Sequence, residues 1–170
     1  MNSSTDTYTL HQTPAALAKD LIALLPLTQT DVLCEPFKGE GAFFNNFPAD
    51  NPKIWAEIRQ GKDYTQITEE YDWVITNPPF RLEGTDGKGK NAIADLLLYF
   101  LARARKGVAF LVSDYGLGTL TPRRRKQIED LGWNLTQMTM CQVSKWRGRY
   151  YFLVFTKSPS TCLSYLSGKY

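Results

Sequence analysis

The stretch Tyr71–Phe80 constrains the fold of this chain more than any other. Its apolar run Trp73–Ile75 is followed, after two polar residues, by the pair Pro78-Pro79. So short an apolar run predicts a buried strand and not a helix, and strands covered on both faces are typical of parallel sheets. Proline fixes φ and lacks a backbone donor, so a stiff elbow is expected at the carboxyl end of this strand. Open α/β sheets bind their ligands at that end.

The residues of this elbow, Asn77–Phe80, predict a site for a flat amine. The Asn77 amide oxygen and the carbonyl of Pro78 are two acceptors that a rigid backbone can hold close together. Such a pair can bind both hydrogens of an amino group, and Phe80 can stack on the ring that carries it. The alternative is an ordinary strand-end turn in which Asn77 caps the chain and Phe80 packs.

Asn77-Pro78-Pro79-Phe80 resembles the catalytic motif of S-adenosylmethionine-dependent amino-methyltransferases. That family methylates adenine N6, cytosine N4 and some glutamine amides. The resemblance implies that Asn77, Pro78, Pro79 and Phe80 are catalytic and that Asn77 also contacts the cofactor.

A second stretch, Glu35–Gly41, resembles the cofactor loop of the same family. It follows the predicted strand Asp31–Cys34 and has an acidic residue before Pro-Phe-x-Gly-x-Gly. Glycines let a backbone turn tightly and approach a ligand, although a plain strand-to-helix turn would also explain them. The resemblance implies cofactor contacts from Glu35, Pro36, Phe37, Gly39 and Gly41. Lys38 stands where the family often has a small residue, and its side chain is expected to point to solvent.

Four further residues are considered for holding the cofactor. Glu57 follows the predicted strand Lys53–Ala56, where a carboxylate can accept both hydroxyls of a ribose; a solvated surface Glu is the alternative. The resemblance implies that Asp63 binds the adenine amino group, while Tyr64 either stacks on that ring or belongs to the core. Thr13, predicted to cap a helix that begins at Pro14, stands where one family arrangement touches the methionine end.

The remaining pattern predicts a doubly wound, mostly parallel α/β sheet of the class I methyltransferase type. Helices are expected from Pro14 to Pro26, from 92 to 105 and from Pro122 to Gly132, with a buried strand at 108–112. The segment between Glu57 and Asp72 is too short for a full crossover, so the third strand and its helix should be reduced or missing. Strands at 135–143 and 149–156 predict a C-terminal antiparallel hairpin. One domain, 1–170, is expected, with 1–10 and 158–170 peripheral.

Basic and aromatic residues are the candidates for substrate contact. Arg81, Lys88 and Lys90 lie in a Gly-rich, charged loop after the elbow, and Arg123 begins a run of four basic residues at a helix start. Lys145, Trp146, Arg147 and Arg149 combine both characters at the hairpin tip. Solvated loops, a solvated helix face and a packed tryptophan are the respective alternatives.

Composition excludes some classes and leaves others open. No apolar run is long enough to cross a bilayer, and the polar N-terminus lacks a secretory pattern. Three widely spaced cysteines and one histidine form no ligand spacing, which favours a reducing cytoplasm and argues against a metal site. The net charge of +3 permits nucleic-acid binding without requiring it.

Together these features predict methyl transfer from S-adenosylmethionine to adenine N6, in DNA in preference to RNA. The alternatives are methylation of RNA adenine or of a protein glutamine, and a non-catalytic module that binds nucleic acid or a partner. Dinucleotide chemistry fits poorly, because the loop lacks the third glycine of Gly-x-Gly-x-x-Gly. The chain leaves no room for a separate target-recognition region, so a partner subunit for specificity is conceivable.

Overall fold

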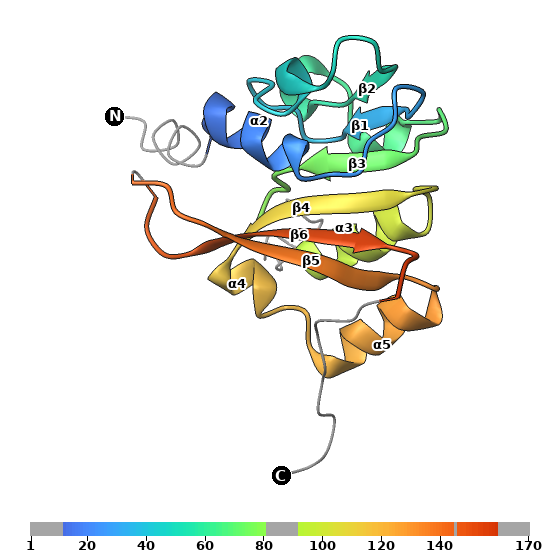
Figure 1. Cartoon of the computed structure of the whole chain (residues 1–170), viewed down its shortest axis with the longest axis vertical. Helices are drawn as coiled ribbons and strands as arrows, with labels where there is room; N and C mark the ends of the chain where they lie inside the picture. Colours follow the sequence, from blue (N-terminus) through green and yellow to red (C-terminus); the bar gives the residue numbers. More distant parts are fainter. Residues whose placement is uncertain (1–11, 81–91, 145, 160–170) are drawn as a thin grey trace.

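A six-stranded mixed sheet organises the molecule (Figure 1). A computed structural model describes residues 12–80, 92–144 and 146–159. The sheet order is β2-β1-β3-β4-β6-β5. In chain order the strands are β1 (Leu33–Glu35), β2 (Lys53–Trp55), β3 (Trp73–Thr76), β4 (Gly107–Ser113), β5 (Asn134–Cys141) and β6 (Tyr150–Thr156).

Helices cover both faces of this sheet. Ala18, Leu21 and Ile22 of α2 (Ala15–Ala23) pack on one face. The other face carries α3 (Ile93–Leu101), α4 (Asp114–Leu117) and α5 (Pro122–Asp130). Three single-turn 3₁₀ helices complete the described elements: η1 (Phe44–Asn46), η2 (Ile58–Gln60) and η3 (Tyr64–Gln66).

The strand pairing confirms the predicted architecture. Strands β2, β1, β3 and β4 run parallel, whereas β6 is antiparallel to both β4 and β5. The predicted terminal hairpin is therefore the pair β5 and β6. Between β2 and β3 the chain forms only η2 and η3 among its regular elements. The strand and helix that the class I arrangement would place between β2 and β3 are therefore reduced, as predicted. The resulting fold is the doubly wound, Rossmann-like arrangement expected from the sequence.

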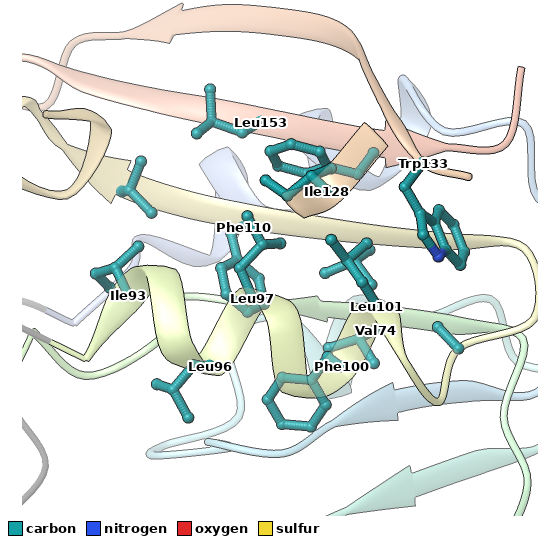
Figure 2. Close-up of a cluster of buried hydrophobic side chains, with 14 of the residues drawn as sticks. Val74, Ile93, Leu96, Leu97, Phe100, Leu101, Phe110, Ile128, Trp133 and Leu153 are labelled. Atoms are coloured by element: carbon teal, nitrogen blue, oxygen red, sulfur yellow. The ribbon is translucent and has the colours of Figure 1, made fainter. Parts of the chain in front are cut away.

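Two apolar clusters, one on each face, hold the layers together. Figure 2 shows the larger one, in which Phe110 and Leu153 of the sheet meet Ile93, Leu97 and Leu101 of α3. Apolar side chains on neighbouring strands and on one helix face are removed from water together, which is the main source of stability in such a layer. No helix in the described ranges is both long and apolar enough to span a membrane.

Element boundaries differ from the predictions at two helices. Thr13 does not cap α2, because Pro14 occupies the cap position and no side chain caps that helix. The predicted helix over 92–105 ends already at Leu101, and Arg105 lies beyond it, paired with Glu70 and Asp72. Thr121 caps α5 as predicted, with its hydroxyl accepting the Arg124 N–H.

Candidate active site

The elbow and the glycine loop (Glu35–Gly41) lie at the same edge of the sheet. Strands β1 and β3 are parallel neighbours with Cys34 opposite Val74, so the segments that follow them leave the sheet on the same side. The carboxyl edge of a parallel sheet is where ligands bind in this architecture. The two motifs, far apart in the sequence, therefore form one candidate site.

Asn77 and Thr13 are joined directly at this edge. The Asn77 amide nitrogen donates to Thr13 Oγ1 over 3.2 Å. Thr13 is thus turned toward the elbow, which explains why it does not cap α2. With the amide nitrogen directed to Thr13, the amide oxygen is the acceptor of this side chain.

Phe80 closes the elbow against neighbouring segments. Its carbonyl accepts the Ala92 N–H at 3.2 Å, which ties the elbow to the start of α3. The Phe80 ring packs on the apolar cluster that includes Trp146 and Tyr150 of the hairpin. Pro78 is buried, whereas Pro79 is half-buried. The elbow is therefore anchored on both sides.

Glu35 supports the glycine loop from inside the protein. Its side chain is 2% exposed, and Oε2 accepts the Phe44 N–H at 2.6 Å. Burial raises the pKa of the Glu35 carboxyl to about 9. The group is therefore protonated at neutral pH, and it fixes the chain where the loop returns toward η1.

Glu57 joins the glycine loop to the end of β2. Its side chain is 4% exposed. Oε2 accepts the Gly39 N–H at 2.6 Å and Oε1 accepts the Arg59 N–H at 3.0 Å. Since a carboxylate can accept about four hydrogen bonds, Glu57 retains capacity for hydroxyl groups of a ligand. The alternative of a solvated surface Glu is excluded by this burial.

Lys38 does not point freely into solvent, contrary to the sequence-based expectation. Its ammonium group lies 4.4 Å from the Trp55 ring centroid and 5.3 Å from that of Phe44. Its backbone N–H donates to Ala56 O at 2.9 Å. A cation over an aromatic face is attracted by the ring quadrupole, and this attraction holds the Lys38 side chain across the loop.

Backbone conformation explains the glycines of the loop. Gly39 and Gly41 have φ of 51° and 85°, values that other residues rarely adopt. A Cβ on Gly41 would also lie 2.9 Å from the Asn45 amide nitrogen. Gly41 is thus required both by its conformation and by its neighbour.

The aromatic residues predicted at the cofactor belong mainly to the core. Phe37 packs on Tyr64 and Phe100 with ring centroids 5.2 and 5.9 Å apart. Tyr64 also contacts Tyr99, so the core alternative describes it. Pro36 is buried beside them. The loop residues Pro36 and Phe37 therefore hold the loop in place through packing.

Asp63 and Ile58 stand beside the end of β2. Asp63 caps η3, with Oδ1 accepting the Thr65 N–H at 2.9 Å, and a carboxylate has further acceptor sites for a ligand donor. Ile58, which sequence reasoning missed, is 68% exposed although it is a branched apolar residue. The signal was its position directly after the strand-end Glu57. An exposed apolar face there is suited to a purine ring.

The basic and aromatic candidates for substrate contact divide into several groups. Arg81, Lys88, Lys90 and Lys145 lie outside the described residues. Arg123 is exposed at the start of α5, but the three basic residues after it pair with Asp95, Glu129 and Asp130. The basic run is thus largely a paired helix face.

At the hairpin, the predicted stacking role of Trp146 is not supported. Trp146 is 8% exposed and lies against Tyr150, with ring centroids 4.4 Å apart. It is buried because the turn folds back on β6. Trp146 is therefore a packed core residue, which was the alternative to a nucleic-acid contact. Arg147 and Arg149 are exposed as expected. Asp114 and Tyr115, which no motif indicated, lie on α4, and Asp114 contacts Arg149.

Comparisons with known proteins identify the fold. No protein family matches the sequence, and no curated protein matches it either. Among solved structures, a proposed RNA methyltransferase from Pyrococcus horikoshii has a TM-score of 0.62 and 18% identity over 89% of each chain. A proposed class I S-adenosylmethionine-dependent methyltransferase from Listeria monocytogenes has a TM-score of 0.65 and 12% identity, over 91% of this chain and 63% of that one.

The modification subunit of a proposed type I restriction enzyme from Vibrio vulnificus also shares the fold. The TM-score is 0.62 with 15% identity, over 88% of this chain and 45% of that subunit. At these identities the likeness concerns architecture alone. The chain therefore has the class I methyltransferase fold predicted from its two motifs.

Proposed function

We propose that this protein is an S-adenosylmethionine-dependent methyltransferase that acts on the N6 amino group of adenine in DNA. The observation that carries the proposal is the Asn77–Phe80 elbow beside the glycine loop, with the Asn77 amide oriented by Thr13. The shared fold of methyltransferases supports the reaction class, since the Listeria protein of this fold is described as S-adenosylmethionine-dependent.

The residues beside the glycine loop fit this cofactor. Glu57 is an acceptor for ribose hydroxyls, Ile58 is an exposed apolar surface for the adenine, and Asp63 has a carboxylate oxygen for its amino group. The positive φ angles of Gly39 and Gly41 allow a close backbone approach. When bound, the cofactor supplies an electrophilic methyl group on sulfur.

The elbow would prepare the amine for attack on that methyl group. The lone pair of an exocyclic amine is delocalised into the ring. Acceptors on Asn77 and Pro78 would hold both amine hydrogens and favour a more tetrahedral nitrogen. Phe80 would hold the ring, and alignment of donor with acceptor would provide much of the rate. In a duplex the adenine would first have to leave the stack.

DNA is the substrate we favour, and other substrates define the test. The Vibrio protein of this fold is a modification subunit of a proposed restriction enzyme, while the Pyrococcus protein is a proposed RNA methyltransferase. The elbow chemistry suits any planar amine, including RNA adenine and a glutamine amide. A partner subunit could supply sequence specificity.

The decisive experiment measures transfer of labelled methyl from S-adenosylmethionine to matched DNA, RNA and protein panels. Label on DNA adenine N6 is expected, and Asn77→Ala should reduce the rate by about 100- to 1,000-fold, as for loss of one transition-state partner. Asn134→Ala, at the opposite edge of the sheet, is the matched control and should leave the rate unchanged. Label only on RNA or only on protein would mean that this polymer, and not DNA, is the substrate. Cofactor binding without any transfer would favour a binding role.

A further inference from the structure

We propose that the outer side of α4 and the tip of the β5–β6 hairpin bind the nucleic-acid strand that flanks the target base. This surface, here named the flanking platform, consists of Tyr115, Arg147 and Arg149, with Asp114 joining its two parts. The inference rests on the proposed function, because it concerns the substrate of the same site.

The flanking platform adjoins the elbow through direct contacts. A Cβ on Gly116 would lie 2.9 Å from Val112 Cβ and 3.5 Å from Ile93 Cγ1, so α4 is seated tightly on the start of α3. The preceding residue, Ala92, donates its N–H to the Phe80 carbonyl. Figure 1 shows α4 and the end of β5 at the same edge of the sheet as the end of β3. The helix that carries Tyr115 is therefore linked to the elbow through the start of α3.

Tyr115 provides an aromatic face that the fold itself does not use. It is 67% exposed, and it is the only aromatic residue among the exposed large hydrophobic residues of the described ranges. Bases stack on such side chains regardless of sequence, with a contribution of about 1–3 kcal/mol per base. The structure thus assigns to Tyr115 the stacking role that the sequence suggested for Trp146.

Asp114 fixes the arginine side of the flanking platform. Oδ2 accepts the Arg149 N–H at 3.2 Å and lies 3.6 Å from Arg149 Nε. The Asp114 N–H donates to Arg149 O at 3.0 Å. Oδ1 accepts the Tyr151 hydroxyl at 3.0 Å, and this hydrogen bond lowers the pKa of Asp114. Asp114 is therefore a positioning residue that orients Arg149.

The buried side of the hairpin makes this arrangement rigid. Trp146 packs against Tyr150 with the two rings tilted by 49°, and both residues belong to the cluster on which Phe80 packs. The exposed Arg147 and Arg149 flank Gly148, whose φ of 87° forms the turn. An aromatic face and two exposed guanidinium groups on a rigid edge fit a polynucleotide strand, which offers bases and phosphates side by side. A protein substrate would not require this alternation.

The test measures binding of labelled oligonucleotides, without cofactor, by fluorescence anisotropy. The DNA probe carries an adenine opposite an abasic position, so that the base leaves the stack at low cost. Tyr115→Ala should weaken binding by about 10-fold through loss of stacking, and Tyr115→Phe should retain it. Arg147→Ala and Arg149→Ala should each lower the slope of log affinity against log salt by about 1. Lys126→Ala, on α5, is the control for loss of a cation.

Asp114→Asn separates positioning from simple charge. By charge alone, removal of a carboxylate should strengthen DNA binding, whereas loss of Arg149 orientation should weaken it. Weaker binding than wild type supports the positioning role, and stronger binding overturns it. Calorimetric S-adenosylmethionine binding, unchanged in all these variants, would show that the cofactor half is intact.

The outcomes for the two proposals are distinguishable. If DNA is methylated but Tyr115→Ala and both arginine variants bind and turn over like wild type, the flanking platform is refuted and the reaction stands. If the variants lose DNA binding but the wild-type protein transfers no methyl group to DNA, the reaction is refuted and the flanking platform stands. If the variants lose binding only to an RNA probe, the flanking platform stands and the strand that it binds is RNA. Protein methylation that is sensitive to Tyr115→Ala would overturn it.

Discussion

The glycine-loop region and the hairpin-tip region stabilise their acidic side chains in opposite ways. At the glycine loop, Glu35 and Glu57 are buried, and their oxygens accept backbone N–H groups. At the hairpin tip, Asp114 is exposed and binds the side chains of Tyr151 and Arg149 as well as backbone. One region is determined by backbone geometry and the other by side-chain contacts on the surface.

This difference suggests a division of labour. A small ligand that must be enclosed needs a loop whose backbone is fixed from within, as Glu57 fixes Gly39. A polymer that must slide past needs exposed groups on a rigid support, as at Arg149. We expect substitutions of buried residues in the first region to alter stability and cofactor binding together. In the second region, exposed residues should alter substrate binding alone.

The largest expected effect is on the buried support of the hairpin tip. Trp146→Ala should lower the free energy of unfolding by about 3–5 kcal/mol, as for other buried aromatic truncations. Tyr115→Ala, an exposed aromatic on the neighbouring α4, should change it by less than about 0.5 kcal/mol. Urea unfolding followed by circular dichroism compares the two. Equal effects of the two variants would mean that the burial of Trp146 does not stabilise the hairpin tip.

The next largest effect is expected at Glu57. Glu57→Ala leaves the Gly39 N–H without its acceptor, which should cost about 1–3 kcal/mol of stability, and cofactor binding should weaken further. Glu40→Ala, an exposed change in the same loop, is the matched control and should have little effect on either. Thermal unfolding with and without S-adenosylmethionine measures both quantities. A stabilising effect of the cofactor equal to that in wild type would argue against a ribose contact.

Sequence patterns identified the glycine-loop region and missed much of the hairpin-tip region, for a physical reason. Gly39, Gly41 and the two prolines are required by local backbone conformation, and local requirements are visible in sequence. The missing third strand followed from segment length alone. The position of Trp146 depends on how the tip folds back on Tyr150, and the position of Lys38 depends on Trp55 across the loop. No local pattern contains such tertiary contacts.

Two other residues show the same limit. Thr13 was predicted to cap a helix, but the adjacent elbow offers it the Asn77 amide instead. Helix α4 has only four residues, too few for a periodic pattern, so Tyr115 had no element to be assigned to. Both become interpretable only when β3 and β4 bring their ends together.

A smaller effect is expected at Gly41, and it tests how far the loop depends on local backbone. Gly41→Ala and Gly61→Ala should both lose about 1–2 kcal/mol, because each residue has a positive φ. A Cβ at Gly61 meets nothing within 4 Å, whereas at Gly41 it meets Asn45. Gly41→Ala should therefore cost more, and Asn45→Ala should remove the excess. If Gly61→Ala costs as much, the Asn45 contact is unimportant.

The smallest expected effect, the change over a single pH unit, concerns Glu35. Its folded pKa of about 9 lies above the ordinary 4.5 of a glutamic acid, so the folded state retains a proton that the unfolded state has released. Stability contributed by this group is complete below the unfolded pKa and is lost as pH rises toward about 9. From about pH 6 to about pH 7 the loss is at most about 1.4 kcal/mol.

Glu35→Gln isolates that contribution, because glutamine keeps an acceptor for the Phe44 N–H but does not titrate. The difference in unfolding free energy between variant and wild type should shift in favour of the variant as pH rises through this window. Titration of every other group is common to both proteins and cancels in the difference. A difference that is flat with pH would mean that Glu35 is ionised in the fold. The glycine loop would then be held at Glu35 by a buried carboxylate charge that accepts the Phe44 N–H.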